Sequence, residues 1–147
     1  MAKPRVAAGA LFLDEDGRVL LVHPDYKPTW DIPGGYVEPN ETPLEACRRE
    51  VQEELGIKPP IGRLLVADWA PSPSEGDKIL FIFDGGILDA DEQARIQLEG
   101  ELTEYAFYDP DDLDEPLIPR LSRRVRQALD SRDRRIMTYL EHGERQG

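Results

Sequence analysis

The chain has 147 residues, of which 39% are hydrophobic and 33% charged, and this balance indicates one folded domain and excludes a disordered polymer. A formal net charge of −12 repels long polyanions and argues against duplex nucleic acid as a partner, although bound cations can reverse the local field for a small phosphorylated substrate. The single cysteine excludes an intramolecular disulfide, and no apolar stretch is long enough to cross a membrane. We therefore expect a single domain over residues 1–147 with a cytoplasmic location.

The first third of the chain predicts a β-hairpin and a loop. Residues 6–13 and 19–23 are mostly apolar and read as strands, and the acidic turn 14–17 between them ends in a glycine. Residues 24–28 read as a loop, and 30–35 as a short extended piece that ends in two glycines.

The clearest helix is predicted to begin after Thr42, which is a capping residue. Pro43 suits the first helical position, and Glu45 completes a capping box. Gly56 can end the helix in a left-handed conformation. Apolar residues recur at helical spacing and predict the buried stripe, namely Leu44, Cys47, Val51 and Leu55.

The rest of the chain predicts strands at 61–70, 79–87 and 101–108, followed by a last helix over 119–139. Because strands and helices interleave, the fold class is mixed α/β or α+β. Arginines gather near the C-terminus, and we interpret them as a solvated helix face with local ion pairs, phosphate binding being the alternative: Arg120, Arg123, Arg124, Arg126, Arg132, Arg134 and Arg135.

Three acids on the first helix stand out because of their spacing. Glu50, Glu53 and Glu54 occupy positions i, i+3 and i+4, so they share one face, where like charges repel. Hard divalent cations such as Mg²⁺ favour carboxylate and carbonyl oxygens. Gly34 and Gly35 permit a close backbone approach and can aim a carbonyl at a metal. The pattern therefore predicts a metal site where the helix meets the sheet.

The same segment resembles a known family motif. It reads Gly35, five residues, Glu41, seven residues, and then Arg-Glu-Val-Gln-Glu-Glu-Leu-Gly-Ile over 49–57. This resembles the complete Nudix box, G-x5-E-x7-REU-x-EE-x-G-U, in which U is a bulky aliphatic residue. The preceding residues 30–34 and the following Glu38 resemble the usual flanks of the box.

The resemblance implies a Nudix-type α/β/α sandwich with a central mixed β-sheet. It also implies a divalent cofactor, Mg²⁺ or alternatively Mn²⁺, and a set of metal ligands that consists of Glu50, Glu53, Glu54 and the carbonyl of Gly34. Arg49 belongs to the implied catalytic group, while Glu41 and Gly35 have the role of orienting it.

The implied chemistry is attack by an activated water on a phosphorus of a diphosphate. Glu53 is the first candidate for the general base, and Glu101 and Glu104 are the later alternatives. Four further residues are candidate substrate contacts, although packing is the stronger reading for the tryptophan: Tyr26, Lys27, Trp30 and Glu38.

The expected function is Mg²⁺-dependent hydrolysis of a phosphoanhydride bond in a nucleoside diphosphate linked to another group, with a nucleoside triphosphate favoured. ADP-ribose, nucleotide sugars and dinucleoside polyphosphates remain alternative substrates. A nucleotide-sensing module without catalysis is the alternative from another class, but such modules typically lose the box glutamates that this chain keeps. The resemblance is compatible with a homodimer, which no segment requires.

Overall fold

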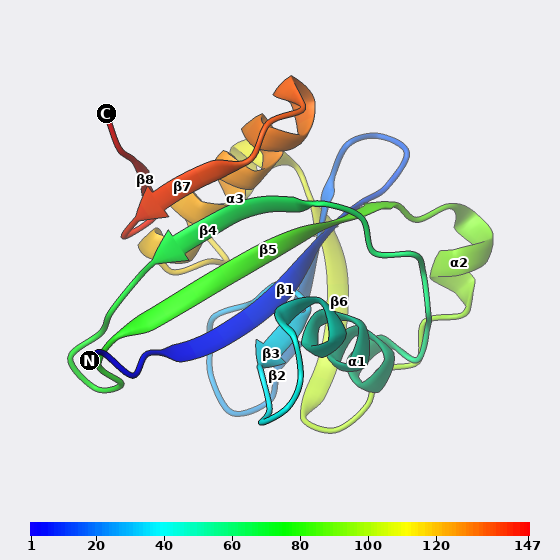
Figure 1. Cartoon of the computed structure of the whole chain (residues 1–147). Coiled ribbons are helices and arrows are strands. Elements are labelled where there is room, and N and C mark those ends of the chain that lie inside the picture. The colour runs from blue at the N-terminus through cyan, green and yellow to red at the C-terminus, as the bar shows by residue number, and fades with distance from the viewer.

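The computed structural model describes residues 1–147 and has a central mixed sheet with helices on both faces (Figure 1). The elements are β1 (Arg5–Leu13), β2 (Val19–Pro24), β3 (Gly34–Tyr36), α1 (Pro43–Leu55), β4 (Leu64–Trp69), β5 (Lys78–Ile87), α2 (Ala90–Ala94), β6 (Leu102–Tyr108), a 3₁₀ turn η1 (Pro110–Asp112), α3 (Pro119–Arg134), β7 (Thr138–Glu141) and β8 (Glu144–Arg145). The strand order is β6-β2-β1-β5-β4-β7-β8, with β3 paired to β1 outside this path. The predicted fold class is confirmed.

Alternation along β1 builds the two layers of the core. Ala8, Ala10 and Phe12 pack toward α1, with the buried residues of that helix, whereas Leu11 and Leu13 pack toward α3. Successive side chains of a strand point to opposite faces, so one central strand supplies both cores. Its nearly continuous apolar sequence is therefore the pattern of a strand that is covered on both sides.

The predicted ends of α1 are those observed. The Thr42 side chain accepts from the backbone N–H of Glu45, and the Glu45 side chain accepts from the N–H of Thr42. Gly56 ends the helix with φ 70° and ψ 16°. These reciprocal bonds satisfy N–H groups that a helix start otherwise leaves free.

The prediction of one helix over 119–139 is wrong in its last part. The helix ends at Arg134, because Arg135 adopts a left-handed conformation (φ 57°, ψ 43°) and the N–H of Ile136 returns to the carbonyl of Ser131. The chain then pairs parallel to β4 as β7, and Leu140 packs into the α3-side core. Apolar residues after the helix were thus strand residues rather than part of a helical stripe.

The extended segment after the hairpin forms β3, which pairs antiparallel with the N-terminal half of β1. The register places Gly9 opposite Gly34, and the backbone N–H of Ala10 donates to the carbonyl of Pro33 in the flanking pair. Paired and unpaired positions alternate in an antiparallel ladder, so the N–H and C=O of Gly34 point away from β1. No helix of the chain is long and apolar enough to cross a membrane.

Candidate active site

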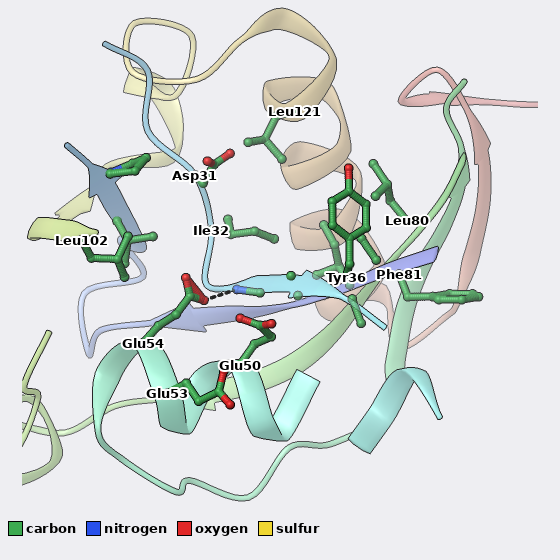
Figure 2. Close-up of a pocket in the computed structure, with 18 of the residues that line it drawn as sticks. Asp31, Ile32, Tyr36, Glu50, Glu53, Glu54, Leu80, Phe81, Leu102 and Leu121 are labelled. Atoms are coloured by element: carbon green, nitrogen blue, oxygen red, sulfur yellow. Dashed lines mark hydrogen bonds between the residues drawn. The ribbon is translucent and has the colours of Figure 1, made fainter. Parts of the chain in front are cut away.

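A cavity of about 1210 Å³ runs around β3, from α1 to the start of α3. Its lining includes all three box acids of α1. Figure 2 shows Glu50, Glu53 and Glu54 on the α1 side of β3, with Leu121 and Tyr36 on the opposite side. The predicted acidic face therefore opens into this cavity.

Glu54 anchors α1 to the free edge of β3. Its Oε1 accepts a 2.7 Å hydrogen bond from the backbone N–H of Gly34, which Figure 2 shows as a dashed line. That N–H is available because it points away from β1. The carbonyl of Gly34, the predicted metal ligand, lies on the same free side of the strand and has no sheet partner there.

Arg49 links the acids to the strand. Its Nε donates to Glu41 at 2.7 Å, and its Nη1 donates to Glu50 at 2.8 Å and to Glu53 at 3.2 Å. Its Nη2 donates to the carbonyl of Tyr36 at 3.1 Å. Four acceptor residues, on β3, on α1 and in the loop between them, fix one planar guanidinium, as expected for an orienting residue.

Gly35 leaves room for Glu50. A Cβ at this position would lie 2.5 Å from the Glu50 Cδ and 2.6 Å from its Oε1. Any side chain here would displace the carboxylate, so the glycine serves close approach rather than an unusual backbone conformation.

Burial and mutual repulsion disfavour the charged form of two carboxyl groups at the site. Burial raises the pKa of Glu54 to about 8, and the charges of Glu50, Asp31 and Glu53 add to that rise, against the bond from Gly34. Burial also raises the pKa of Glu50, against its bonds with Arg49. A bound cation would stabilise both carboxylates in their charged form.

The acids do not converge on one point as they stand. No three acidic, histidine or cysteine side chains lie close enough together to hold an ion. Glu54 is hydrogen-bonded to the N–H of Gly34. Glu53, whose side chain is 60% exposed, is paired with Arg49. The donor set of hard oxygens with unbalanced charge fits a divalent cation, and coordination would require these side chains to exchange their present partners.

Glu41 differs from the cavity acids in its protonation. The hydrogen bond from Arg49 lowers its pKa to about 2, with a further contribution from the backbone N–H of Glu38. It therefore stays charged and holds Arg49, in the position predicted for an orienting residue.

Glu101 and Glu104, the two later candidates for the base, lie in different surroundings. Glu101 lines the cavity. Glu104 is absent from the lining and pairs with Nδ1 of His23 at 3.2 Å. The imidazole of His23 also stacks on Trp30 at 4.9 Å, and Trp30 meets Tyr108 edge-to-face at 5.4 Å. Trp30 is thus packed among other aromatic rings, and it does not line the cavity.

Of the remaining candidate substrate contacts, two line the cavity and one does not. Tyr26, which is 66% exposed, and Lys27 line the cavity. Nζ of Lys27 pairs with Asp31 at 2.7 Å. Glu38 lies outside the lining and is 3.8 Å from Arg49.

Sequence reasoning missed Asp31, Arg120 and Arg124 as cavity residues. Arg124 also corrects the expectation of a solvated arginine face, because it is buried in an ion pair with Asp68. Its position after Leu121 on the apolar side of the helix was the one available signal. The sequence around Asp68 held no signal of this ion pair, because its partner Arg124 is distant in the chain.

Comparison with known proteins assigns the domain. The family model described as "NUDIX domain" matches residues 3–130. The crystal structure of a MutT protein from Methanosarcina mazei Go1 is similar with a TM-score of 0.71 and 31% identity, over 92% of this chain and 97% of that chain.

Two curated relatives match over shorter stretches. An RNA pyrophosphohydrolase from Halorhodospira halophila (strain DSM 244 / SL1) is 46% identical over 55 residues, which are 37% of this chain and 30% of that protein. Diphosphoinositol polyphosphate phosphohydrolase 2 from Rattus norvegicus is 45% identical over 64 residues, 43% of this chain and 36% of that protein. The matched stretches thus span about a third of these relatives' lengths.

Proposed function

Because this chain belongs to the Nudix hydrolase family, we propose that it hydrolyses a phosphoanhydride bond in a nucleoside diphosphate linked to another group. The observation that carries the proposal is the half-buried pair Glu50 and Glu54, whose carboxylate forms are destabilised by burial where α1 meets the free edge of β3. The cavity beside them has room for a nucleotide.

The cofactor we propose is Mg²⁺, with Mn²⁺ as the alternative, since divalent ions are general in this family. The residues that would hold it are Glu50, Glu53, Glu54 and the carbonyl of Gly34. Such an ion supplies neutralisation of phosphate oxygens and a lower pKa for an attacking water.

The protein's own groups would position these partners. Arg49 donates to Glu50, to Glu53 and to the carbonyl of Tyr36, so it links the acids of α1 to β3 before a metal binds. Gly35 keeps the carboxylate of Glu50 close to the strand. A preorganised set of charges is the main source of catalysis in phosphoryl transfer.

For the general base, Glu53 remains our first choice and Glu101 the second. Glu53 lines the cavity and is largely exposed, so its carboxylate can reach water. Glu101 also lines the cavity, whereas Glu104 does not and is bonded to His23. Glu53→Gln and Glu101→Gln should separate the candidates, and Glu104→Gln is the matched control. The variant that lacks the base should lose about 10²–10⁴-fold in kcat.

Within this class we favour a nucleoside triphosphate, cleaved to a monophosphate and pyrophosphate. ADP-ribose, nucleotide sugars and dinucleoside polyphosphates are the alternatives. The test is a panel of these compounds with Mg²⁺ or Mn²⁺, with products identified by mass and by ¹⁸O from water. The label would show which phosphorus is attacked.

A nucleotide-binding module without catalysis is the competing function. It predicts that wild type and Glu53→Gln are equally inactive on the whole panel while both bind a nucleotide. Our proposal requires Mg²⁺-dependent turnover by wild type that the variant reduces by at least about a hundred-fold.

A further inference from the structure

The cavity continues past the acids to a second, cationic end on the other face of β3. One row of register partners crosses four strands of the sheet and forms part of this region: Asp68, Leu80, Ala7 and Tyr36. Neighbouring strands lie about 4.8 Å apart, so the first and last members of the row are about 14 Å apart. In Figure 2, Leu80, Tyr36 and Leu121 lie together on this side, away from the three glutamates.

Arg124 is buried at this end with part of its guanidinium unused. Its side chain is 9% exposed, and Nε donates to Asp68 at 2.6 Å. The other oxygen of Asp68 accepts from the N–H of Gly143. Nη1 and Nη2 of Arg124 have no hydrogen-bond partner in the protein. Oε1 of Gln127 is the only fully inaccessible side-chain nitrogen or oxygen atom that lacks such a partner. The two Nη atoms therefore keep some accessible surface, and the residue lines the cavity.

Arg120 lies one turn earlier, so the two arginines share a face of α3. Its Nη1 donates to the carbonyl of Pro71 at 2.8 Å, and no carboxylate lies within ion-pair distance. Its positive charge is therefore uncompensated. Burial lowers the pKa of Arg124, and the charge of Arg120 lowers it further, against the pairing with Asp68.

The start of α3 adds backbone donors to the same place. Ile118 precedes the helix and provides no side-chain cap. The first-turn N–H groups of Arg120 and Leu121 have no acceptor in the protein, and all three residues line the cavity. An uncapped start of a 16-residue helix favours an anion, because the free N–H groups and the helix dipole both point outward.

We propose that this end of the cavity binds a phosphate group of the substrate that is separate from the scissile diphosphate. The inference rests on the proposed function and adds that, within its substrate class, compounds whose organic part carries a further phosphate bind more tightly than those without one. Donors from two guanidiniums and a helix start approach from several directions. That arrangement suits the several oxygens of a tetrahedral phosphate better than a planar carboxylate.

The test compares the binding of adenosine 3′,5′-bisphosphate with that of AMP by calorimetry, in the presence of a chelator. Neither ligand has a diphosphate, so binding is measured apart from catalysis. Wild type should prefer the bisphosphate by about ten- to a hundred-fold, the effect of charge-assisted hydrogen bonds. The analogue of this bisphosphate with a 3′-carboxymethyl group in place of the 3′-phosphate is the control for charge alone. The logarithm of its affinity ratio to AMP should be less than half of that for the bisphosphate.

Two variants locate the effect. Arg124→Lys keeps an ion pair with Asp68 but loses the free Nη donors, and Arg120→Gln removes the unpaired charge without touching Asp68. Each should reduce the preference by about ten-fold. Arg134→Gln, an exposed arginine of the same helix whose partner is Asp130, is the matched control and should keep the full preference.

Equal binding of the two ligands by wild type, or no binding of either, would overturn the proposal. So would an unchanged preference in Arg120→Gln, even if Arg124→Lys failed to fold. Hydrolysis of nucleoside diphosphate derivatives that lack the extra phosphate is measured separately with Mg²⁺. A preference without any hydrolysis would sink the proposed function alone, whereas hydrolysis without a preference would sink the phosphate site alone.

Discussion

At the scale of single residues, the site is defined by what the carboxylates on α1 touch. Glu54 is half-buried and accepts a hydrogen bond from the N–H of Gly34 in β3. Glu50 lies against the backbone of Gly35, and Glu53 remains largely exposed. Three identical side chains on one helix face thus have different surroundings. Their environment, rather than their chemistry, separates their roles.

The raised pKa of Glu54 predicts a pH-dependent stability. In the metal-free protein the native carboxyl retains a proton up to about pH 8, whereas the carboxyl of the unfolded chain loses it near its ordinary pKa of 4.5. The stabilisation is complete below the unfolded pKa and is lost as the pH rises through the folded pKa. Wild type should therefore lose about 2–4 kcal/mol more than Glu54→Gln between pH 5 and pH 8.

Urea unfolding in EDTA at both pH values measures this difference. Saturating Mg²⁺ should stabilise wild type more at pH 8 than at pH 5, because binding must displace the proton. Parallel pH profiles of wild type and Glu54→Gln would contradict the assignment of the shift to this residue.

Gly35→Ala tests the gap that admits Glu50. The added Cβ would lie within 2.5 Å of the carboxylate, so the acid must move while its backbone stays in place. We expect kcat to fall by about a hundred-fold, with a change in Tm below about 4 °C. Gly62→Ala, whose Cβ would meet only the Asp84 carbonyl and side chain, is the control. An unchanged kcat in Gly35→Ala would show that this close packing is not required.

At the scale of elements, the two main helices end in different ways. α1 ends at Gly56, which adopts its left-handed conformation without steric cost. α3 ends at Arg135, which adopts a similar conformation with a Cβ. The carbonyl of Ser131 in the last turn of α3 and that of Ile136 just after the helix accept hydrogen bonds from the Nη atoms of Arg63. A contact from a distant loop thus takes part in ending a helix that has no terminal glycine.

Arg135→Gly should therefore stabilise the protein. Removing the Cβ relieves the left-handed strain, which is worth about 1 kcal/mol, and the exposed side chain has no hydrogen-bond partner to lose. Arg134→Gly, one position earlier and still helical, should destabilise it by about 0.5–1 kcal/mol. Thermal unfolding of both variants gives the comparison. A lower Tm for Arg135→Gly would mean that the left-handed conformation is not strained.

At the scale of the whole molecule, charge is distributed unevenly. The chain carries −12 overall, while the start of α3 places arginines at one end of the cavity and α1 places acids at the other. Such a surface repels a long polyanion but leaves a local site for a small one.

The net charge predicts discrimination against RNA ends. Free nucleoside triphosphate should be hydrolysed with a kcat/KM at least about ten-fold above that for 5′-triphosphate RNA of matched first base, and added salt should narrow the gap. Pyrophosphate release at two ionic strengths measures both ratios. Comparable efficiency at low salt would indicate an RNA-end function instead.

Local spacing made α1 predictable. Its cap at Thr42, its end at Gly56 and the shared face of its three acids all depend on positions within a few residues, which the helical period relates directly. The end of α3 was not predictable in this way. Nothing near Arg135 resembles a stop signal, and strand pairing with β4 decided it.

The sequence by itself determined the helix of acids, the resemblance to the family and the apolar first strand. Only the tertiary structure decided which of the acids contacts the sheet. Glu54 accepts a hydrogen bond from Gly34, which lies in a strand 20 residues earlier in the chain. It also decided that Arg124 is buried with Asp68, 56 residues away, with its free nitrogens in the cavity. Contacts at such separations depend on strand register and helix docking, which local periodicity does not encode.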